Sequence, residues 1–107
     1  MEYTWDNFKR GLFAVVCNTE DEAISFLRLA KKQECWFHRE WARNLSARAT
    51  QCFHHTQVTY GTVCAFSMTY GAMGYCYPDW YVNHIDFTDF CGEHTPSVQI
   101  KSLDGLV

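Results

Sequence analysis

The chain has 107 residues, of which 48% are hydrophobic and 20% charged, a composition typical of one globular domain. No apolar stretch approaches the roughly 18 residues that a membrane span requires, so the composition excludes a membrane-spanning protein. The net charge of −3, with nine Lys and Arg, argues against a general nucleic-acid binder held by phosphate contacts. The N-terminal residues have no signal-peptide features, and we therefore expect a single compact domain, residues 1–107, in the cytoplasm.

In chain order, the first predicted elements are a buried strand over residues 13–17 and a helix over residues 19–33. Thr19 and Glu22 have the spacing of a capping box at the start of this helix. The apolar residues of the helix recur at helical spacing, and two lysines fall in its last turn. Residues 35–37 are short and apolar and indicate a second strand, which makes the first 38 residues a strand–helix–strand unit.

Residues 39–52 fit two interpretations, a second short helix or a surface excursion. From residue 53 to residue 90 the composition is β-branched and aromatic, which favours strands. A four-residue pattern occurs twice here, at residues 58–61 and 68–71, and predicts two adjacent strands that are each interrupted at Gly.

Further elements complete the predicted fold. A turn is expected at residues 77–80, an alternating strand over residues 84–90, and a last edge strand over residues 97–100. The fold class is therefore α+β, with one main helix packed on a small, mostly antiparallel β-sheet.

Aromatic residues make up 17% of the chain, which is more than a small core can hide. Some of these rings are expected on the surface, where Tyr and Trp suit a binding face. The six cysteines are expected to be reduced thiols in the cytosol, because the chain shows no export signal. Cys17 and Cys64 lie among apolar neighbours and are interpreted as core residues.

Two Cys-x-x-His steps, Cys35–His38 and Cys91–His94, offer the ligands of a structural zinc site. The separation between the two steps is longer than in ordinary sites. In addition, Cys35 and His38 would point to opposite faces of the predicted strand. We favour the interpretation that the thiols are buried and the imidazoles lie on the surface, with no cofactor bound. A structural zinc site is the alternative.

Nothing in the chain marks an active site, so we expect a protein that is not an enzyme. Cys52 is followed closely by His54 and His55, but neighbouring positions on a strand cannot align a nucleophile with a base. Asp86 and Asp89 are three residues apart and would lie on opposite faces of the predicted strand, which makes them a poor acid–base pair.

Charge is distributed unevenly along the chain. Residues 23–48 carry six Lys and Arg against two acidic residues, and residues 49–107 carry one against five. The basic residues, with Trp36 and Trp41 nearby, could bind nucleic acid or an acidic partner, although a solvated helix face explains them more simply. They are Arg28, Lys31, Lys32, Arg39, Arg43 and Arg48.

The C-terminal half combines carboxylates with aromatic side chains, a combination that suits a protein which binds a basic groove. The simpler interpretation places Tyr75 and Trp80 in the core and gives the acidic residues a role in solubility alone. The candidate partner-binding residues are Tyr77, Asp79, Trp80, Asp86, Asp89 and Glu93.

Parts of the chain resemble small accessory proteins carried by phages and mobile elements of Firmicutes. In those proteins a strand that ends in Cys leads into a Thr-Glu-x-Glu-Ala helix start, as residues 13–23 do here. The resemblance extends to Phe26-Leu27, to residues 68–71 and to residues 85–90, and covers about half of the chain. Residues 39–57 fall outside it.

Some phage accessory proteins of this size are anti-CRISPR proteins, which bind an effector nuclease and block its nucleic-acid groove. The resemblance therefore implies an inhibitor whose partner is a CRISPR effector nuclease of the host cell. Asp79, Asp86, Asp89 and Glu93 would take the place of phosphates, and Tyr77 and Trp80 would be the hydrophobic anchors. The alternatives are a zinc-stabilised or basic-face module that binds nucleic acid, and a protein that sequesters a nucleotide signal in an aromatic pocket.

Overall fold

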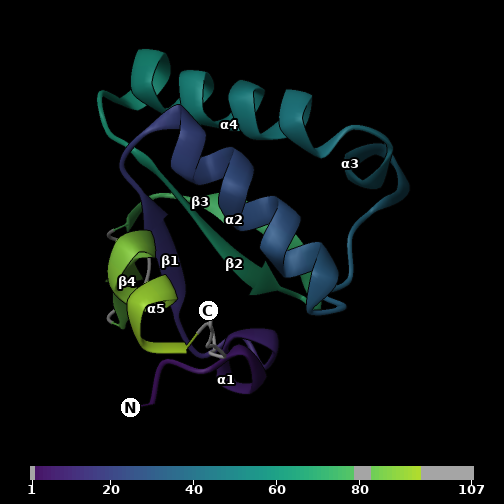
Figure 1. The fold of residues 1–107 in the computed structure, drawn as a ribbon. Helices are drawn as coiled ribbons and strands as arrows, with labels where there is room; N and C mark the ends of the chain where they lie inside the picture. Colours follow the sequence, from purple (N-terminus) through teal and green to yellow (C-terminus); the bar gives the residue numbers. More distant parts are fainter. Residues whose placement is uncertain (1, 79–82, 95–107) are drawn as a thin grey trace.

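A four-stranded sheet carries helices against one of its faces (Figure 1). The computed structural model describes residues 2–78 and 83–94, and for Thr69 and residues 91–94 it describes the backbone alone. The elements are α1 (Trp5–Lys9), β1 (Ala14–Cys17), α2 (Glu20–Lys32), α3 (Arg39–Arg43), α4 (Leu45–Tyr60), β2 (Cys64–Thr69), β3 (Ala72–Cys76), β4 (His84–Asp86) and α5 (Phe87–His94).

The strands lie in the order β3-β2-β1-β4. The pairs β1–β2 and β2–β3 are antiparallel, whereas β4 runs parallel to β1. The fold class is α+β as expected, and the sheet is mixed rather than purely antiparallel. Strands β3 and β4 follow each other in the sequence, but they form the two opposite edges of the sheet.

Helix α2 begins as its sequence predicts. The Thr19 hydroxyl accepts a hydrogen bond from the Glu22 backbone N–H at 3.1 Å, and the Glu22 carboxylate accepts one from the Asn18 N–H at 2.9 Å. These bonds satisfy donors that the first turn of a helix leaves unpaired. The buried face of α2 consists of Ala23, Phe26, Leu27 and Ala30, the spacing that the sequence shows.

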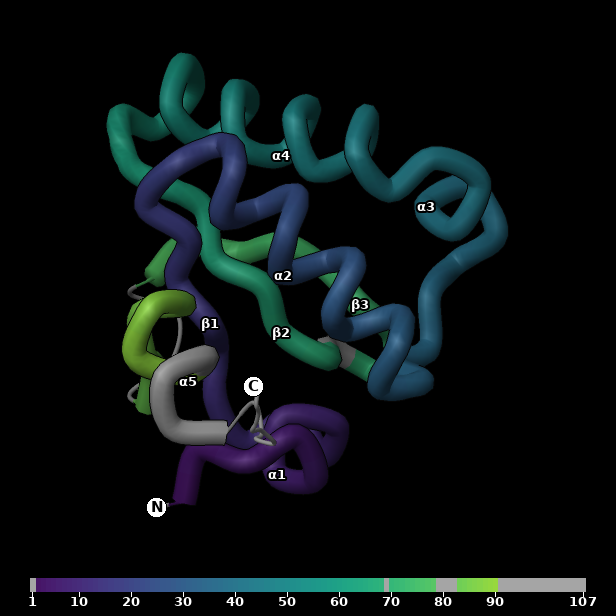
Figure 2. Tube along the Cα trace, viewed as in Figure 1, coloured from purple at the N-terminus to yellow at the C-terminus, as the bar shows by residue number. Residues whose placement is uncertain are grey.

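Helix α4 overturns the strand predicted from residue 53 onward and resolves the uncertainty over residues 39–52. It has 16 residues against 13 in α2, so the fold has two main helices and not one. Figure 2 shows that α4 runs alongside α2, and α4 contacts β2 of the sheet as well as α2. The Asn44 side chain caps its first turn. Its buried residues recur at the helical period and are Ala49, Cys52, Phe53 and Thr56.

The repeated four-residue pattern adopts two different structures. Residues 58–61 end α4, where Gly61 has the left-handed conformation (φ 68°) that commonly terminates a helix. Residues 68–71 end β2 and enter a hairpin turn in which Tyr70 and Gly71 both have positive φ. The strand expected at the first copy is therefore wrong, and the strand expected at the second copy is confirmed.

The strand predicted over residues 84–90 is confirmed only to Asp86, because Phe87 begins α5. Phe87 and Phe90 are three residues apart and both buried, which is a helical spacing. The strand predicted over residues 35–37 is also wrong. This segment makes one backbone hydrogen bond to the sheet, from the Met73 N–H to the Trp36 carbonyl at 2.9 Å. The edge strand predicted over residues 97–100 lies outside the described residues.

The main core fills the space between the sheet and the helices. Val15, Phe66 and Met73 supply the sheet side, and buried residues of α1, α2, α4 and α5 supply the other side. On the opposite sheet face, the small side chains Ala14 and Ala65 form a second buried cluster with Val16 and Cys76. Of the helices in the described ranges, none combines the length and the apolar character needed to cross a bilayer.

Candidate partner-binding site

The rings divide by residue type between the core and the surface. Seven of the eight Phe side chains are buried, and Phe37 is half-buried. Every Tyr and Trp in the described part of the chain keeps part of its ring accessible. Four of these rings are exposed, at Trp36, Tyr60, Tyr70 and Tyr75. The surplus of aromatic residues is therefore located at the surface, as the composition predicts.

A cluster of four rings joins the end of α4 to the end of β3. We call His55, Tyr60, Tyr75 and Tyr77 the tyrosine cluster. The centroid of the Tyr60 ring lies 4.3 Å from that of Tyr77, and the His55 ring lies 5.8 Å from Tyr60 and 5.9 Å from Tyr75. The Thr59 hydroxyl approaches His55 Nδ1 to 3.4 Å. These contacts hold four ring systems from two elements at one place.

Backbone geometry positions this cluster. Gly61 ends α4 directly after Tyr60, so the Tyr60 ring lies at the terminus of the helix. Tyr75 pairs with Phe66 of β2 and therefore lies on the helix-covered face, but at the edge strand, where 38% of its surface stays exposed. Val58, on the last turn of α4, is 83% exposed, and its position three residues after His55 puts it on the neighbouring helix surface.

The hydroxyls of Tyr75 and Tyr77 remain protonated at neutral pH. Desolvation and a hydrogen bond with Tyr60 raise the pKa of Tyr77 to about 12. Desolvation also raises the pKa of Tyr75. Tyr75 and Tyr77 thus present uncharged rings with polar edges, a chemistry common at protein–protein contacts.

The sequence-predicted site residues do not all meet at this cluster. Tyr77 belongs to it, whereas Asp86 ends β4 at the other edge, about 14 Å away by three strand spacings. Asp86 pairs with Val16, so it lies on the sheet face opposite to the one that carries Tyr75. Asp86 and Asp89 are both exposed and form what we call the acidic edge. Asp79 and Trp80, and the side chain of Glu93, lie outside the described part.

The predicted basic face extends over α2, α3 and the start of α4. Two of its members have specific contacts: the Arg28 guanidinium donates to the Ser46 hydroxyl at 2.8 Å, and that of Arg48 lies 5.6 Å from the Trp41 ring centroid. The remaining members, Lys31, Lys32, Arg39 and Arg43, are exposed.

The zinc alternative remains a prediction, because the Cys91 and His94 side chains lie outside the described part. Of the other two proposed ligands, His38 is exposed, and Cys35 is buried in the main core. Burial raises the pKa of Cys35 to about 11, which disfavours the thiolate that zinc requires. Among the described side chains, which end at residue 90, no group of three or more His, Cys, Asp and Glu is placed to hold a metal ion.

The described thiols are buried, and burial raises the pKa of four of them, Cys35, Cys52, Cys64 and Cys76. Burial raises the pKa of Cys52 to about 12, although Cys52 lies two residues from His54. The His54 imidazole contacts another group, since its Nε2 lies 2.9 Å from a Glu20 carboxylate oxygen. The Thr50 hydroxyl donates to the second oxygen of Glu20 at 3.0 Å, so these side chains join α2 to α4.

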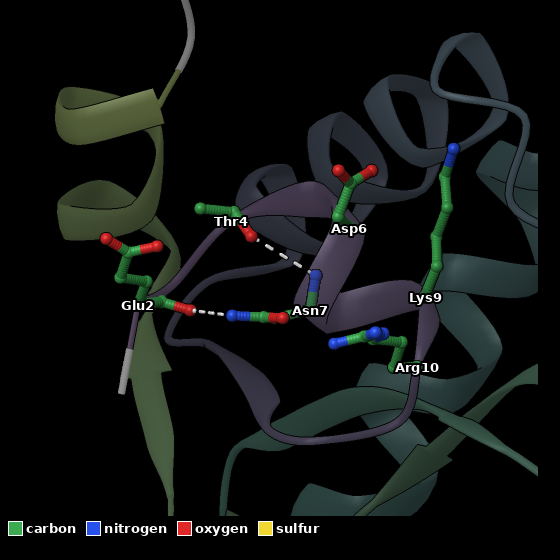
Figure 3. Close-up of a pocket in the computed structure, with 6 residues that line it drawn as sticks. All are labelled: Glu2, Thr4, Asp6, Asn7, Lys9 and Arg10. Carbon is green, nitrogen blue, oxygen red and sulfur yellow. Dashed lines mark hydrogen bonds between the residues drawn. The ribbon is translucent and has the colours of Figure 1, made fainter.

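A polar hollow of about 530 Å³ lies beside α1 (Figure 3). Two of its lining side chains, those of Thr4 and Asn7, form hydrogen bonds at the start of that helix. The Thr4 hydroxyl accepts from the Asn7 N–H, and the Asn7 side-chain amide donates to the Glu2 carbonyl. We assign no ligand to it.

Sequence reasoning missed His55 and Tyr60 as members of the site. Both fall in the segment that was predicted to form strands. The signal that could have found them is the helical spacing of Leu45, Ala49 and Cys52, which continues through Phe53 and Thr56 to the stop at Gly61.

Comparison of the chain with known protein families, with curated proteins and with solved structures found no match.

Proposed function

We propose that this protein is a small inhibitor that acts by binding, in the cytoplasm of a host cell, to a CRISPR effector nuclease and blocking its nucleic-acid groove. The observation that carries the binding role is the tyrosine cluster, in which rings from α4 and β3 are held together at a partly exposed position. The class of partner rests on the resemblance of the sequence to phage accessory proteins.

The cluster is suited to be the anchor of an interface. Tyr and Trp side chains dominate binding energies because they bury a large area and lose little conformational freedom. Tyr60 and Tyr77 already support each other at 4.3 Å, so their rings are ordered before a partner arrives. Such preorganisation lowers the entropic penalty of association.

The acidic edge has a different role in this proposal. Asp86 and Asp89 are too far from the cluster to share a hot spot with it, but their field extends over about 10 Å at 0.1 M salt. Exposed carboxylates there would attract the Lys- and Arg-rich groove of a nuclease and raise the association rate. The tyrosine cluster would then set the dissociation rate.

The test compares two double variants for binding to a guide-loaded effector nuclease and for inhibition of its cleavage. Tyr60→Ala with Tyr75→Thr is expected to weaken binding by about 30-fold or more, mainly through faster dissociation. Asp86→Lys with Asp89→Lys is expected to slow association and to reduce its dependence on salt.

A matched control is Glu2→Lys with Asp21→Lys. It changes the net charge equally, and Asp21 lies in the first turn of α2 as Asp89 does in α5. Equal slowing by the control would show that net charge alone matters and would remove the role of the acidic edge. Unchanged dissociation in the tyrosine variant would disprove the anchor, and failure of the unmodified protein to bind any effector would disprove the partner class.

A further inference from the structure

An apolar hollow of about 560 Å³ lies at the turn between β2 and β3, remote from the tyrosine cluster along the length of β3. Trp36 and His38, from the segment that joins α2 to α3, line it together with Tyr70, Gly71 and Ala72 of the hairpin. Its volume is within the range of sites for small ligands. The Trp36 ring is 57% exposed.

The wall that carries Trp36 is fixed to the fold on both sides of this residue. Cys35 is buried in the main core, and its N–H donates to the Ala30 carbonyl at 3.0 Å. The Trp36 carbonyl accepts from the Met73 N–H of β3. The His38 ring then meets the Trp36 ring edge-on, with centroids 4.9 Å apart.

Tyr70, which also lines the hollow, has a backbone conformation that is unusual for a residue with a side chain. Its φ of 56° is in the left-handed region, which strains a residue with a side chain and which Asn or Gly would adopt more readily. Its side chain is 100% exposed, so it contributes no burial in return. The two-residue hairpin turn requires this positive φ, and it leaves the Tyr70 ring in solvent where it lines the hollow.

The segment that leads into and out of Trp36 carries slightly more basic than acidic residues. Lys9 is close enough to act electrostatically on Cys35, the residue before Trp36. The last turn of α2 contains Lys31 and Lys32, and Figure 1 shows this end of α2 beside the end of β2. Arg39 follows His38 directly. The acidic residues of the same segment are Glu34 and Glu40, so Lys and Arg outnumber them.

We infer that this hollow binds a nucleotide unit, with a planar base against the Trp36 and Tyr70 rings and a phosphate near the surrounding Lys and Arg. Base–aromatic stacking tolerates any base, and basic side chains favour the phosphate. The His38 imidazole can hydrogen-bond to a base edge or a phosphate. The inference is independent of the proposed function, because it uses other residues. A free nucleotide and a single-stranded nucleic acid share this chemistry.

The test uses a fluorescein-labelled oligothymidine and a labelled oligouridine in anisotropy titrations, and AMP and UMP in calorimetry. Trp36→Ala and Tyr70→Asn are each expected to weaken binding by about tenfold or more. Tyr70→Asn removes the ring but suits the positive φ, so it preserves the hairpin. Tyr75→Thr, at the tyrosine cluster, is the control and should bind as the unmodified protein does.

The two nucleotide sources give different results. Equal affinity for AMP or UMP and for the oligomers identifies a free nucleotide as sufficient, whereas much tighter binding of the oligomers, with strong salt dependence, identifies a single strand. Absence of binding to every probe would overturn the inference, and a protein segment would then be the remaining occupant. Retention of full affinity in both variants, or equal binding of a duplex of the same length, would overturn it as well.

Discussion

Phe66 and Tyr75 are direct neighbours in the sheet, but their side chains differ in burial. They pair in register on β2 and β3 and face the same side. Phe66 is fully buried, and its ring centroid lies 5.7 Å from that of Phe26 and 6.4 Å from that of Trp41. Tyr75 is 38% exposed and meets His55 instead. The difference follows from strand order, because β2 lies under the helices and β3 is an edge.

This comparison divides the aromatic residues into inner rings, which stabilise the fold, and outer rings, which are available for binding. The inner rings are the buried Phe side chains, and the outer rings are Trp36, Tyr60, Tyr70 and Tyr75. The division predicts that substitutions in the two groups have different effects.

The largest effect is expected at Phe66. Phe66→Ala should lower the free energy of unfolding by about 3–5 kcal/mol, because it removes a buried ring and leaves a cavity between the sheet and α2. Urea unfolding followed by circular dichroism measures this change. Phe66→Leu keeps most of the volume and should lose less than about 1.5 kcal/mol. A loss below about 1 kcal/mol in the alanine variant would contradict the assignment of Phe66 to the core.

The sequence predicts the first part of the fold well where local signals agree. In residues 13–33 the apolar run, the Thr19 cap and the helical spacing all indicate the same elements, and β1 and α2 are found there. Residues 53–60 are poor helix formers, yet they form the end of α4 because Phe53 and Thr56 are buried on its inner face. The Thr56 hydroxyl donates to the Cys52 and Phe53 carbonyls, so its polar group is satisfied in the helix.

The candidate site is predicted only in part, for a topological reason. The abundance of surface aromatic residues follows from composition, and Tyr77 was expected at the site. Strand order cannot be obtained from the local pattern, however, so the sequence could not show that Tyr77 and Asp86 lie at opposite edges of the sheet. Nor could it bring Tyr60 next to Tyr77, since residues 58–61 and 68–71 look alike and fold differently.

An intermediate effect on stability is expected at alkaline pH from the thiols that are buried in the core. Burial raises the pKa of Cys64 to about 12, whereas the unfolded chain releases this proton near pH 8.5. The folded state therefore holds more protons between these two values, and stability falls as the pH rises through them. Below about pH 8 the thiol is protonated in both states and contributes no pH dependence.

One such thiol lowers the free energy of unfolding by at most about 1.4 kcal/mol per pH unit. Cys64→Ala should lower stability at pH 7 through lost packing, and this difference from the unmodified protein should shrink as the pH rises from 9 to 10. Urea unfolding with a reductant at each pH measures it. Val15→Ala is the control, because it removes buried methyl groups and no thiol, so its difference should stay constant. A constant difference for Cys64→Ala would show that the thiol titrates normally and is not in a dry core.

The smallest effect on stability is expected at Tyr75, the partner of Phe66 in the comparison. Tyr75→Thr leaves a β-branched residue suited to a strand and removes a ring that is partly in water, so the free energy of unfolding should change by less than about 1 kcal/mol. The same urea experiment measures this change beside Phe66→Ala. If the two variants lost similar stability, Tyr75 would belong to the inner rings, and its exposed surface would be a by-product of packing. A small loss of stability together with faster dissociation from a partner is the result that separates an outer ring from an inner one.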